Sequence, residues 1–174
     1  MDFTVRAATK EDCKDIWRMI TELAVYEKMA DQVKISPEDL ERDGFGQNPL
    51  FECLVVEVPE EQKSTDGFIV VGYALYFYTY STWTGVCVHL EDLYVMPHFR
   101  GNGIGKSLLS KVAQIAKQKQ CARLQLCALE WNTPSRDFYA YKGAQDLTAT
   151  EGWHMLRFDG HTLDSLAQED AKGS

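Results

Sequence analysis

A glycine-rich stretch, Arg100-Gly101-Asn102-Gly103-Ile104-Gly105, lies between an apolar run and a helical pattern. The unpaired N–H groups and the dipole at a helix N-terminus favour an anion, and glycine lets a phosphate or pyrophosphate approach the backbone closely. Lys106 could add a positive charge there, although a solvated helix lysine is an equal alternative. The stretch therefore suggests a site for a phosphate-bearing cofactor. The alternative interpretation is a glycine-rich turn that binds no ligand.

Two better-known phosphate-binding motifs do not fit this stretch. A Walker A loop has four residues between its first glycine and the Gly-Lys pair, whereas only three separate Gly101 from Gly105. The dinucleotide fingerprint requires a glycine where this chain has Lys106, and no parallel βαβ unit precedes the loop. The counting excludes both motifs.

Three carboxylates and one tyrosine could supply the reactive groups. Glu27 ends the first predicted helix, and Glu91 and Asp92 are neighbours on a predicted strand. Carboxylates attract a cation and can take a proton from an ammonium, and the Tyr139 phenol can donate a proton at neutral pH. Plain alternatives are an exposed helix residue for Glu27 and a packing tyrosine for Tyr139. On a regular strand, Glu91 and Asp92 would point to opposite faces.

Composition narrows the class of protein. The chain has 174 residues, 45% hydrophobic and 11% aromatic, which predicts one compact domain. Its net charge of −8 argues against nucleic acid and anionic membranes as partners and favours small cations. The histidines, His89 among them, form no ligand-spaced cluster, so we expect no metal and structural roles for them. No segment is long and apolar enough to span a membrane, and no signal peptide is recognisable.

The five cysteines are odd in number and contain no C-x-x-C pair. Reduced thiols in a cytoplasmic protein are the simplest explanation. Cys127, on the strand predicted at 123–129, is expected to be a buried apolar thiol.

Strand and helix patterns alternate along the chain. Strands are predicted at 3–6, 51–58, 68–80, 85–95, 123–129 and 152–158, and helices after the starts at 9–12, 36–39, 103–104 and 132–135. This order predicts an α+β fold, a mixed sheet with helices on both faces. We expect a single domain over 1–166 and a disordered tail over 167–174.

The loop, with Leu93-Tyr94-Val95 upstream and residues 132–139 downstream, resembles the GNAT acetyltransferase superfamily. In that family the pattern Arg/Gln-x-x-Gly-x-Gly/Ala holds the pyrophosphate of coenzyme A, and Arg100, Gly103 and Gly105 match it. Within the superfamily the chain is similar to the diamine acetyltransferases over nearly its whole length. Matching blocks include Tyr26-Glu27, Asp43-Gly44-Phe45-Gly46, Leu90-Glu91-Asp92, Trp131-Asn132, Phe138-Tyr139 and Glu151-Gly152-Trp153.

The resemblance implies the GNAT fold, with a mostly antiparallel mixed sheet and a β-bulge in the strand that carries Glu91. A bulge re-aims side chains and frees a backbone N–H for the thioester carbonyl. It also implies a homodimer that transfers acetyl from acetyl-CoA directly to a primary amine. Glu91 is then the base, acting through water, and Tyr139 the general acid for the departing thiolate.

The resemblance also assigns the binding residues. The cofactor set is Leu93, Tyr94, Val95, Arg100, Gly101, Asn102, Gly103, Ile104, Gly105, Lys106, Asn132, Thr133, Pro134, Ser135 and Tyr139. The acceptor set is Tyr26, Glu27, Ser81, Thr82, Trp83, Glu91, Asp92, Gln125, Leu126, Cys127 and Leu129.

Two differences within the family bear on the acceptor. The spermidine/spermine type has Asp-Pro before the tryptophan that corresponds to Trp83 and an alanine at position 129. Here Ser81, Thr82 and Leu129 match the sister type, whose acceptor is thialysine. Fewer acidic anchors and more bulk favour a shorter, less cationic amine, so polyamines are expected to be weak substrates. A spermidine/spermine acetyltransferase, a non-catalytic acetyl-CoA-binding module and a protein lysine acetyltransferase stay open as alternatives.

Overall fold

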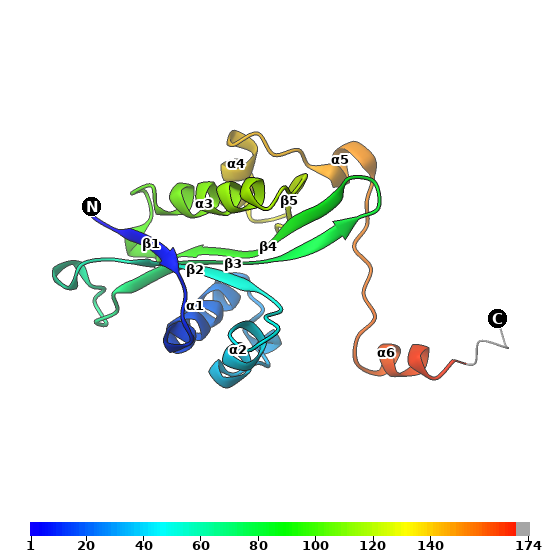
Figure 1. Ribbon diagram of the computed structural model, residues 1–174, viewed down its shortest axis with the longest axis horizontal. Helices are drawn as coiled ribbons and strands as arrows, with labels where there is room; N and C mark the ends of the chain where they lie inside the picture. Colours follow the sequence, from blue (N-terminus) through cyan, green and yellow to red (C-terminus); the bar gives the residue numbers. More distant parts are fainter. Residues whose placement is uncertain (170–174) are drawn as a thin grey trace. The chain divides into compact units, whose positions relative to one another are not determined.

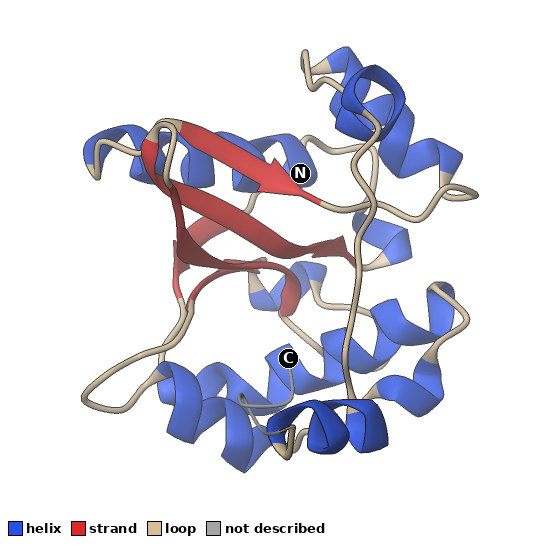
Figure 2. Cartoon of the chain, turned by 90° about the vertical axis from the view of Figure 1, so that its right-hand side faces the viewer, coloured by secondary structure: helices blue, strands red, loops and turns tan. Residues whose placement is uncertain are grey.

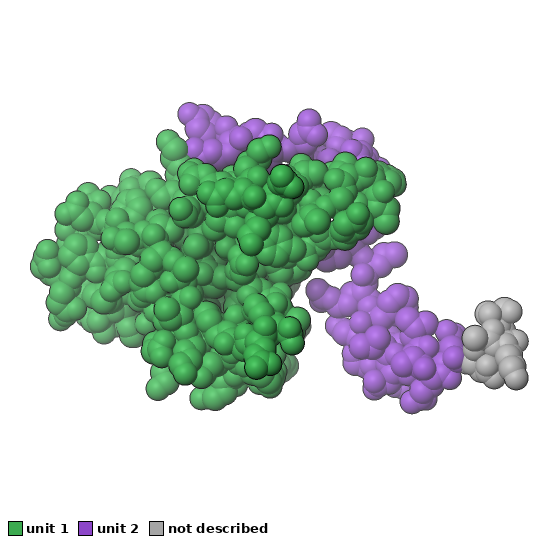
Figure 3. Space-filling view, in the orientation of Figure 1, with its two compact units in different colours: residues 1–129 green, residues 130–174 purple. Residues whose placement is uncertain are grey.

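The computed structural model describes residues 1–169 (Figure 1). The chain divides into two compact units, residues 1–129 and residues 130–174, which Figure 3 colours separately. Each unit is described by itself.

The first unit is built on a sheet of five strands, which lie side by side in chain order. They are β1 (Thr4–Ala7), β2 (Glu52–Glu57), β3 (Val70–Ser81), β4 (Gly85–Val95) and β5 (Arg123–Leu126). The first four pair antiparallel, and β5 pairs parallel to β4. A parallel pair needs a crossover connection, which α3 (Ile104–Gln118) supplies. The predicted mixed, mostly antiparallel sheet is confirmed.

Helices cover both faces of this sheet (Figures 1 and 2). One face carries α1 (Cys13–Tyr26) and α2 (Pro37–Gly44), and α3 lies on the other. A short 3-10 turn over Lys10–Asp12 leads into α1 and has the predicted capping box between Thr9 and Asp12. The box that opens α2 is also confirmed, because the Ser36 hydroxyl accepts a hydrogen bond from the Asp39 N–H at 3.1 Å.

The hydrophobic core fills both sides of the sheet. Ile16 and Met19 of α1 are fully buried, as are Leu108 and Val112 of α3. Strand β2 is buried on both faces along Cys53–Val56. Burial of each such side chain stabilises the fold by roughly 1.5–3 kcal/mol. The middle of the sheet is therefore the rigid part on which neighbouring side chains are held.

The second unit contains α4 (Thr133–Tyr141), α5 (Leu147–Glu151) and α6 (Gly160–Ala167). The start of α4 is as predicted, because the Asn132 side chain accepts a hydrogen bond from the Ser135 N–H at 3.4 Å. Helices α5 and α6 are additions to the prediction. Asp146 caps α5, and a capping box from Asp159 opens α6.

Two strand predictions need correction. Residues 152–158 form no strand, since they pair with none of the strands in residues 1–169, and Trp153, Met155 and Phe158 are exposed. A strand requires a neighbour for its N–H and C=O groups, which an apolar pattern alone does not provide. Strand β5 ends at Leu126, three residues earlier than predicted. Of the predicted tail, Ala167 ends α6, and residues 170–174 lie outside the described residues.

Helix α3 ends in a strained residue. Gln120, two residues after the end of α3, has a φ of 59°. Residues other than glycine adopt this left-handed backbone conformation at a cost in free energy. Its N–H donates to the Lys117 carbonyl, and the Cys121 N–H donates to the Ala116 carbonyl. This pair of bonds is the helix-ending arrangement that glycine usually completes.

We expect Gln120→Gly to raise the free energy of unfolding by about 0.5–1 kcal/mol, because relief of the left-handed strain exceeds the extra entropy of the unfolded chain. Urea denaturation measures the change. The matched control is Gln114→Gly, an exposed position inside α3, which should lose about 1 kcal/mol. A loss of stability at both positions would contradict the assignment of strain to Gln120.

Candidate active site

Strand β4 has one residue more than β3 at the predicted acidic pair. Asp92 lies opposite Leu75 and Leu90 lies opposite Tyr76, so Glu91 has no partner on β3. This is the β-bulge that the resemblance predicts. An extra residue breaks the strict alternation of side chains, so neighbouring residues can share a face.

The register shows which face they share. Residues directly opposite each other on paired strands point to the same side, so Asp92 lies with Leu75, and Tyr94 with Tyr73. This side is the α1 face, because the Tyr94 hydroxyl donates to Glu22 of α1 at 2.8 Å.

Glu91 also belongs to the α1 face. Its Oε2 lies 3.4 Å from Nε2 of His89, and the His89 ring lies 5.1 Å from that of Phe77, its partner on β3. Phe77 is two residues from Leu75 and therefore shares its side. The bulge thus brings Glu91 and Asp92 to one face of the sheet, which rules out the alternative of opposite faces.

The third predicted carboxylate is close to this pair. Burial raises the pKa of Glu27, and the negative charges of Asp92 and Glu91 raise it further. Burial raises the pKa of Asp92 as well, as does the charge of Glu91, while a hydrogen bond from Tyr73 lowers it. We call Glu27, Glu91 and Asp92 the acidic cluster. Mutual repulsion and partial burial mean that a cation bound among them would stabilise all three charges.

The glycine loop has the geometry of an anion cradle. Gly101 and Gly103 have φ values of 82° and 83°, and Gly103 is the N-cap of α3. The first N–H groups of α3 have no acceptor within the helix, so they can bind an anion. Because Gly103 holds a left-handed conformation that other residues rarely adopt, the loop depends on glycine there.

Arg100 connects this loop to the end of α1. Its Nε donates to the Val95 carbonyl at 2.8 Å. Its guanidinium lies 5.7 Å from the centre of the Tyr26 ring and 5.6 Å from that of Tyr94. The predicted pyrophosphate residue and the predicted acceptor residue Tyr26 are therefore direct neighbours.

One edge of β4 is open beside the bulge. Pairing with β5 stops at Leu90 and Leu126, so within residues 1–169 no strand covers the edge from Glu91 to Val95. Leu93, Tyr94 and Val95 from the predicted cofactor set lie on it. An extended ligand with amide groups, such as pantetheine, can bind such an edge as an additional strand would.

Residues of β5 divide between the two faces. Gln125 lies opposite His89 and shares its face, whereas Leu126 lies opposite Leu90 and packs on the hydrophobic core. Partial desolvation raises the pKa of the Cys127 thiol, and the charge of Glu91 raises it further, which indicates that Cys127 is near the acidic cluster. Its side chain is exposed, so the prediction of a buried thiol was wrong. The other four cysteines are buried.

The predicted acceptor residues Ser81, Thr82 and Trp83 lie at the turn between β3 and β4. The Ser81 hydroxyl accepts hydrogen bonds from the N–H groups of Trp83 and Thr84, at 3.1 and 3.2 Å, and so shapes the turn. Glu91 is six positions after Gly85 on β4, which corresponds to roughly 20 Å at about 3.3 Å per residue. Within one chain, the structure does not bring this turn to the acidic cluster.

The remaining predicted residues lie after β5. Leu129 ends the first unit, Asn132 caps α4, and Thr133–Ser135 begin that helix. Tyr139 is on α4, with its ring 5.2 Å from that of Phe138. The roles of these residues in cofactor binding and proton donation stay predictions.

Sequence reasoning missed two residues of the first unit. His89, expected to be structural, is next to Glu91, and its position two residues earlier on a strand was an available signal. Tyr73 donates a hydrogen bond to Asp92 at 2.8 Å. Nothing in the sequence indicated this bond, because it depends on the bulge.

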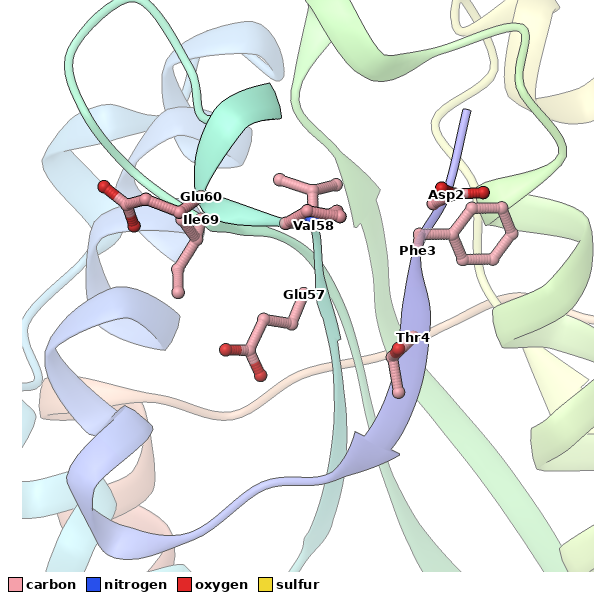
Figure 4. Close-up of a pocket in the computed structure, with 8 residues that line it drawn as sticks. Asp2, Phe3, Thr4, Glu57, Val58, Glu60 and Ile69 are labelled. Atoms are coloured by element: carbon pink, nitrogen blue, oxygen red, sulfur yellow. The ribbon is translucent and has the colours of Figure 1, made fainter.

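A separate hollow of about 440 Å³ lies at the other end of the sheet. Figure 4 shows its lining, with Phe3 and Thr4 at the start of β1 on one side and Glu57, Val58 and Ile69 on the other. It contains none of the predicted site residues. The acidic cluster is the candidate acceptor site.

Comparison with known proteins agrees with this geometry. The Acetyltransferase (GNAT) family profile matches residues 14–143. The chain belongs to the GNAT acetyltransferase family. It is an acyltransferase, and the family uses acetyl-CoA as the donor.

Individual relatives of this acetyltransferase cover most of its length. A thialysine N-epsilon-acetyltransferase of Mus musculus is 51% identical over 163 residues, 94% of this chain and 96% of that protein. Spermidine/spermine N(1)-acetyltransferase-like protein 1 of Homo sapiens is 44% identical over 97% of this chain and 24% of that protein. A solved integron cassette protein from the mobile metagenome of V. cholerae has a TM-score of 0.76 and 25% identity, covering 97% of this chain and 99% of its own.

Residues 1–169 of this acetyltransferase contain neither a cluster of metal ligands nor a membrane-spanning helix. No group of three or more His, Cys, Asp or Glu side chains is placed to hold a metal ion there. No helix in the same range is long and apolar enough to cross a membrane.

Gly105 provides a test of the cradle. It is the second residue of α3, and a Cβ there would meet only Val95 Cγ2, at an ordinary 3.9 Å. The fold therefore has no need of glycine here, and alanine is the better helix former. Because the family pattern accepts glycine or alanine at this position, we expect Gly105→Ala to keep or raise the thermal midpoint and to retain acetyl-CoA binding. Gly105→Glu, which adds bulk and a negative charge, should weaken binding at least about tenfold, or 1.4 kcal/mol. Calorimetric titration with acetyl-CoA measures both affinities, and unchanged affinity in the glutamate variant would remove Gly105 from the cofactor site.

The acidic cluster makes a prediction about stability. A carboxyl with a raised pKa in the folded state favours the fold while protonated, and this contribution is lost as pH rises through that pKa. Ionised Asp92 is therefore destabilising at neutral pH. We expect Asp92→Asn to raise the thermal midpoint at pH 7.5, with a difference that shrinks as the pH falls.

The matched control is Asp39→Asn in the α2 capping box. Hydrogen bonds with Ser36 lower the pKa of Asp39, so its ionised form stabilises the fold. This substitution should lower the thermal midpoint at pH 7.5. Equal effects of the two substitutions would contradict the electrostatic description of the cluster.

Proposed function

We propose that this acetyltransferase transfers the acetyl group of acetyl-CoA to the side-chain amine of thialysine or of a similar small amine, with weak activity on polyamines. The observation that carries the proposal is the acidic cluster, which gathers Glu27, Glu91 and Asp92 on one face beside the open edge of β4. The murine thialysine N-epsilon-acetyltransferase, 51% identical, supports the choice of amine.

Acetyl-CoA is proposed to bind along the residues of the cofactor set. The left-handed glycines and Arg100 support a pyrophosphate at the N-terminus of α3, and the open edge at Leu93–Val95 supports pantetheine. Asn132–Ser135 and Tyr139 are assigned to the thioester end by the family resemblance. No metal takes part in this mechanism.

The reaction requires a neutral amine. An ammonium with a pKa near 10.4 must lose its proton before attack, and Glu91 accepts it through water. The amine nitrogen then bonds to the thioester carbonyl carbon, and a backbone N–H at the bulge stabilises the oxyanion. As the carbon–sulfur bond breaks, the nitrogen bonded to the acetyl group loses its second proton to solvent, and Tyr139 donates its own proton to the thiolate. Glu91 and Tyr139 then return to their resting protonation states through solvent, with a net release of one proton.

A spermidine/spermine acetyltransferase is the second candidate. The human spermidine/spermine N(1)-acetyltransferase-like protein 1, 44% identical, supports it, and so does the density of negative charge in the cluster. Ser81, Thr82 and Leu129, which match the thialysine type, argue for the first candidate. A non-catalytic acetyl-CoA-binding module and a protein lysine acetyltransferase rank below both, because the cluster suits a small free amine.

A homodimer is also proposed. The hairpin of β3 and β4 exposes large apolar side chains, with Tyr80 and Trp83 about three-quarters exposed at 74% and 75%. Trp153, Met155, Leu156 and Phe158 in the second unit are exposed as well. Surfaces of this kind favour coverage by a partner.

Two further expectations belong to this proposal. The five free cysteines support a reducing, cytoplasmic location. A single catalytic domain over residues 1–166 is supported by the family match, which runs from residue 14 to residue 143 and so includes parts of both units.

The deciding experiment is a parallel measurement of kcat/KM on thialysine, lysine, spermidine and spermine. The thiol of released coenzyme A is detected to measure the rate. We expect thialysine to have the highest value and the polyamines values at least about tenfold lower, a difference of about 1.4 kcal/mol. A preference for spermidine would favour the second candidate. No turnover of any amine, with thermal stabilisation by coenzyme A, would favour the binding module.

Tyr139→Phe tests the general acid. Loss of the hydroxyl removes the proton donor for the thiolate, so we expect kcat to fall by about 10²–10⁴-fold. The affinity for acetyl-CoA should change little, because the ring is retained. Tyr141→Phe, an exposed tyrosine two residues later, is the control. Unchanged kcat in the first variant would exclude Tyr139 from this role.

A further inference from the structure

Tyr73 is a fully buried tyrosine whose hydroxyl has a carboxylate partner. It lies in the middle of β3 with 0% of its surface exposed. Its hydroxyl donates to Oδ2 of Asp92 at 2.8 Å, and its ring lies 6.2 Å from that of Tyr94. Because the ring is enclosed by the core, the hydroxyl is held at a fixed position beneath the acidic cluster.

The two oxygens of Asp92 are in different situations. Oδ2 accepts the Tyr73 hydrogen bond. Oδ1 accepts no hydrogen bond from residues 1–169. Among these residues, the fully buried side-chain atoms without a partner are Arg18 Nε and Gln62 Oε1, so Oδ1 of Asp92 is within reach of solvent. One oxygen is therefore anchored to the core, and the other is available to a ligand.

The groups around Asp92 come from four elements. Cys53 of β2, Tyr73 of β3, Glu91 of β4 and Glu27 after α1 all interact with it electrostatically. The two carboxylates repel a negative charge, and the Cys53 thiol donates to the Leu54 carbonyl. Of these four groups, the Tyr73 hydroxyl is the one that donates a hydrogen bond to Asp92.

We propose that Tyr73 is a positioning residue of the acceptor site, which holds Oδ2 of Asp92 so that Oδ1 binds the ammonium of the substrate. The inference rests on the proposed function, since it requires an amine at the acidic cluster. Tyr73 acts through Asp92 and contacts neither the amine nor acetyl-CoA. Its hydroxyl therefore matters for the amine and not for the cofactor.

Tyr73→Phe removes the hydroxyl and keeps the ring in the core. We expect the KM for the amine to rise about tenfold, with the affinity for acetyl-CoA unchanged. In the wild-type enzyme the Tyr73 hydrogen bond lowers the pKa of Asp92, so its loss should raise that pKa. The acidic limb of kcat/KM against pH should therefore move to higher pH. Because acid unfolding of a destabilised variant would also move this limb, circular dichroism of both enzymes over the same pH range is the necessary control, and the shift is measured where the folded fraction is constant.

Tyr78→Phe is the matched control. Tyr78 lies on the same strand, and its hydroxyl also donates to a carboxylate, Oε2 of Glu52 at 3.1 Å. Glu52 is at the start of β2 and outside the predicted acceptor set. This variant should keep the wild-type KM and the wild-type pH profile.

A double-mutant cycle tests whether Tyr73 acts through Asp92. If it does, Tyr73→Phe should lower kcat/KM little further in an Asp92→Asn background. Equal losses in both backgrounds, or an unchanged amine KM and acidic limb in the single variant, would overturn the proposal. These results are distinct from failure of the proposed function, in which the wild-type enzyme itself acetylates no amine.

Discussion

The acceptor site depends on a single extra residue in β4. Asp92 pairs with Leu75 and Leu90 pairs with Tyr76, and Glu91 between them has no partner on β3. This extra residue interrupts the alternation of side chains along β4. A regular strand would put one of these two carboxylates among the apolar residues under α3. With the bulge, both lie on the α1 face, near Glu27. The same irregularity occurs where β5 stops pairing, so the charged face and the open edge meet at one point of the sheet.

The acidic cluster lowers the stability of the free protein, and a cation bound among its carboxylates would recover part of that stability. Burial and mutual repulsion raise the pKa values of Glu27 and Asp92, so their ionised forms are unfavourable in the empty site. The surrounding core, with Val55, Val56 and Val71 fully buried, supplies the stability that keeps the carboxylates in place. A cationic amine would remove part of the repulsion, which is how a site can be organised before its ligand arrives.

Arg100 lies between the two proposed binding sites. Its side chain is bonded to the end of β4 and lies over the rings of Tyr26 and Tyr94, while its backbone begins the glycine loop. Tyr26 directly precedes Glu27 of the acidic cluster. Arg100 therefore contacts the residue that directly precedes a carboxylate of the acidic cluster. Contact through one side chain is a direct physical connection between cofactor and amine sites.

Local signals in the sequence determined the strands of the first unit, the capped helix starts, the glycine loop and the family. Capping boxes, glycine positions and apolar periods act within a few residues, so they can be recognised without a partner. Tertiary pairing decided the rest. The shared face of Glu91 and Asp92, the Tyr73 hydrogen bond, the distance of Ser81 from the cluster and the absence of a strand at 152–158 all depend on which strand lies opposite which residue. Register is a property of two segments, and one segment's pattern does not contain it.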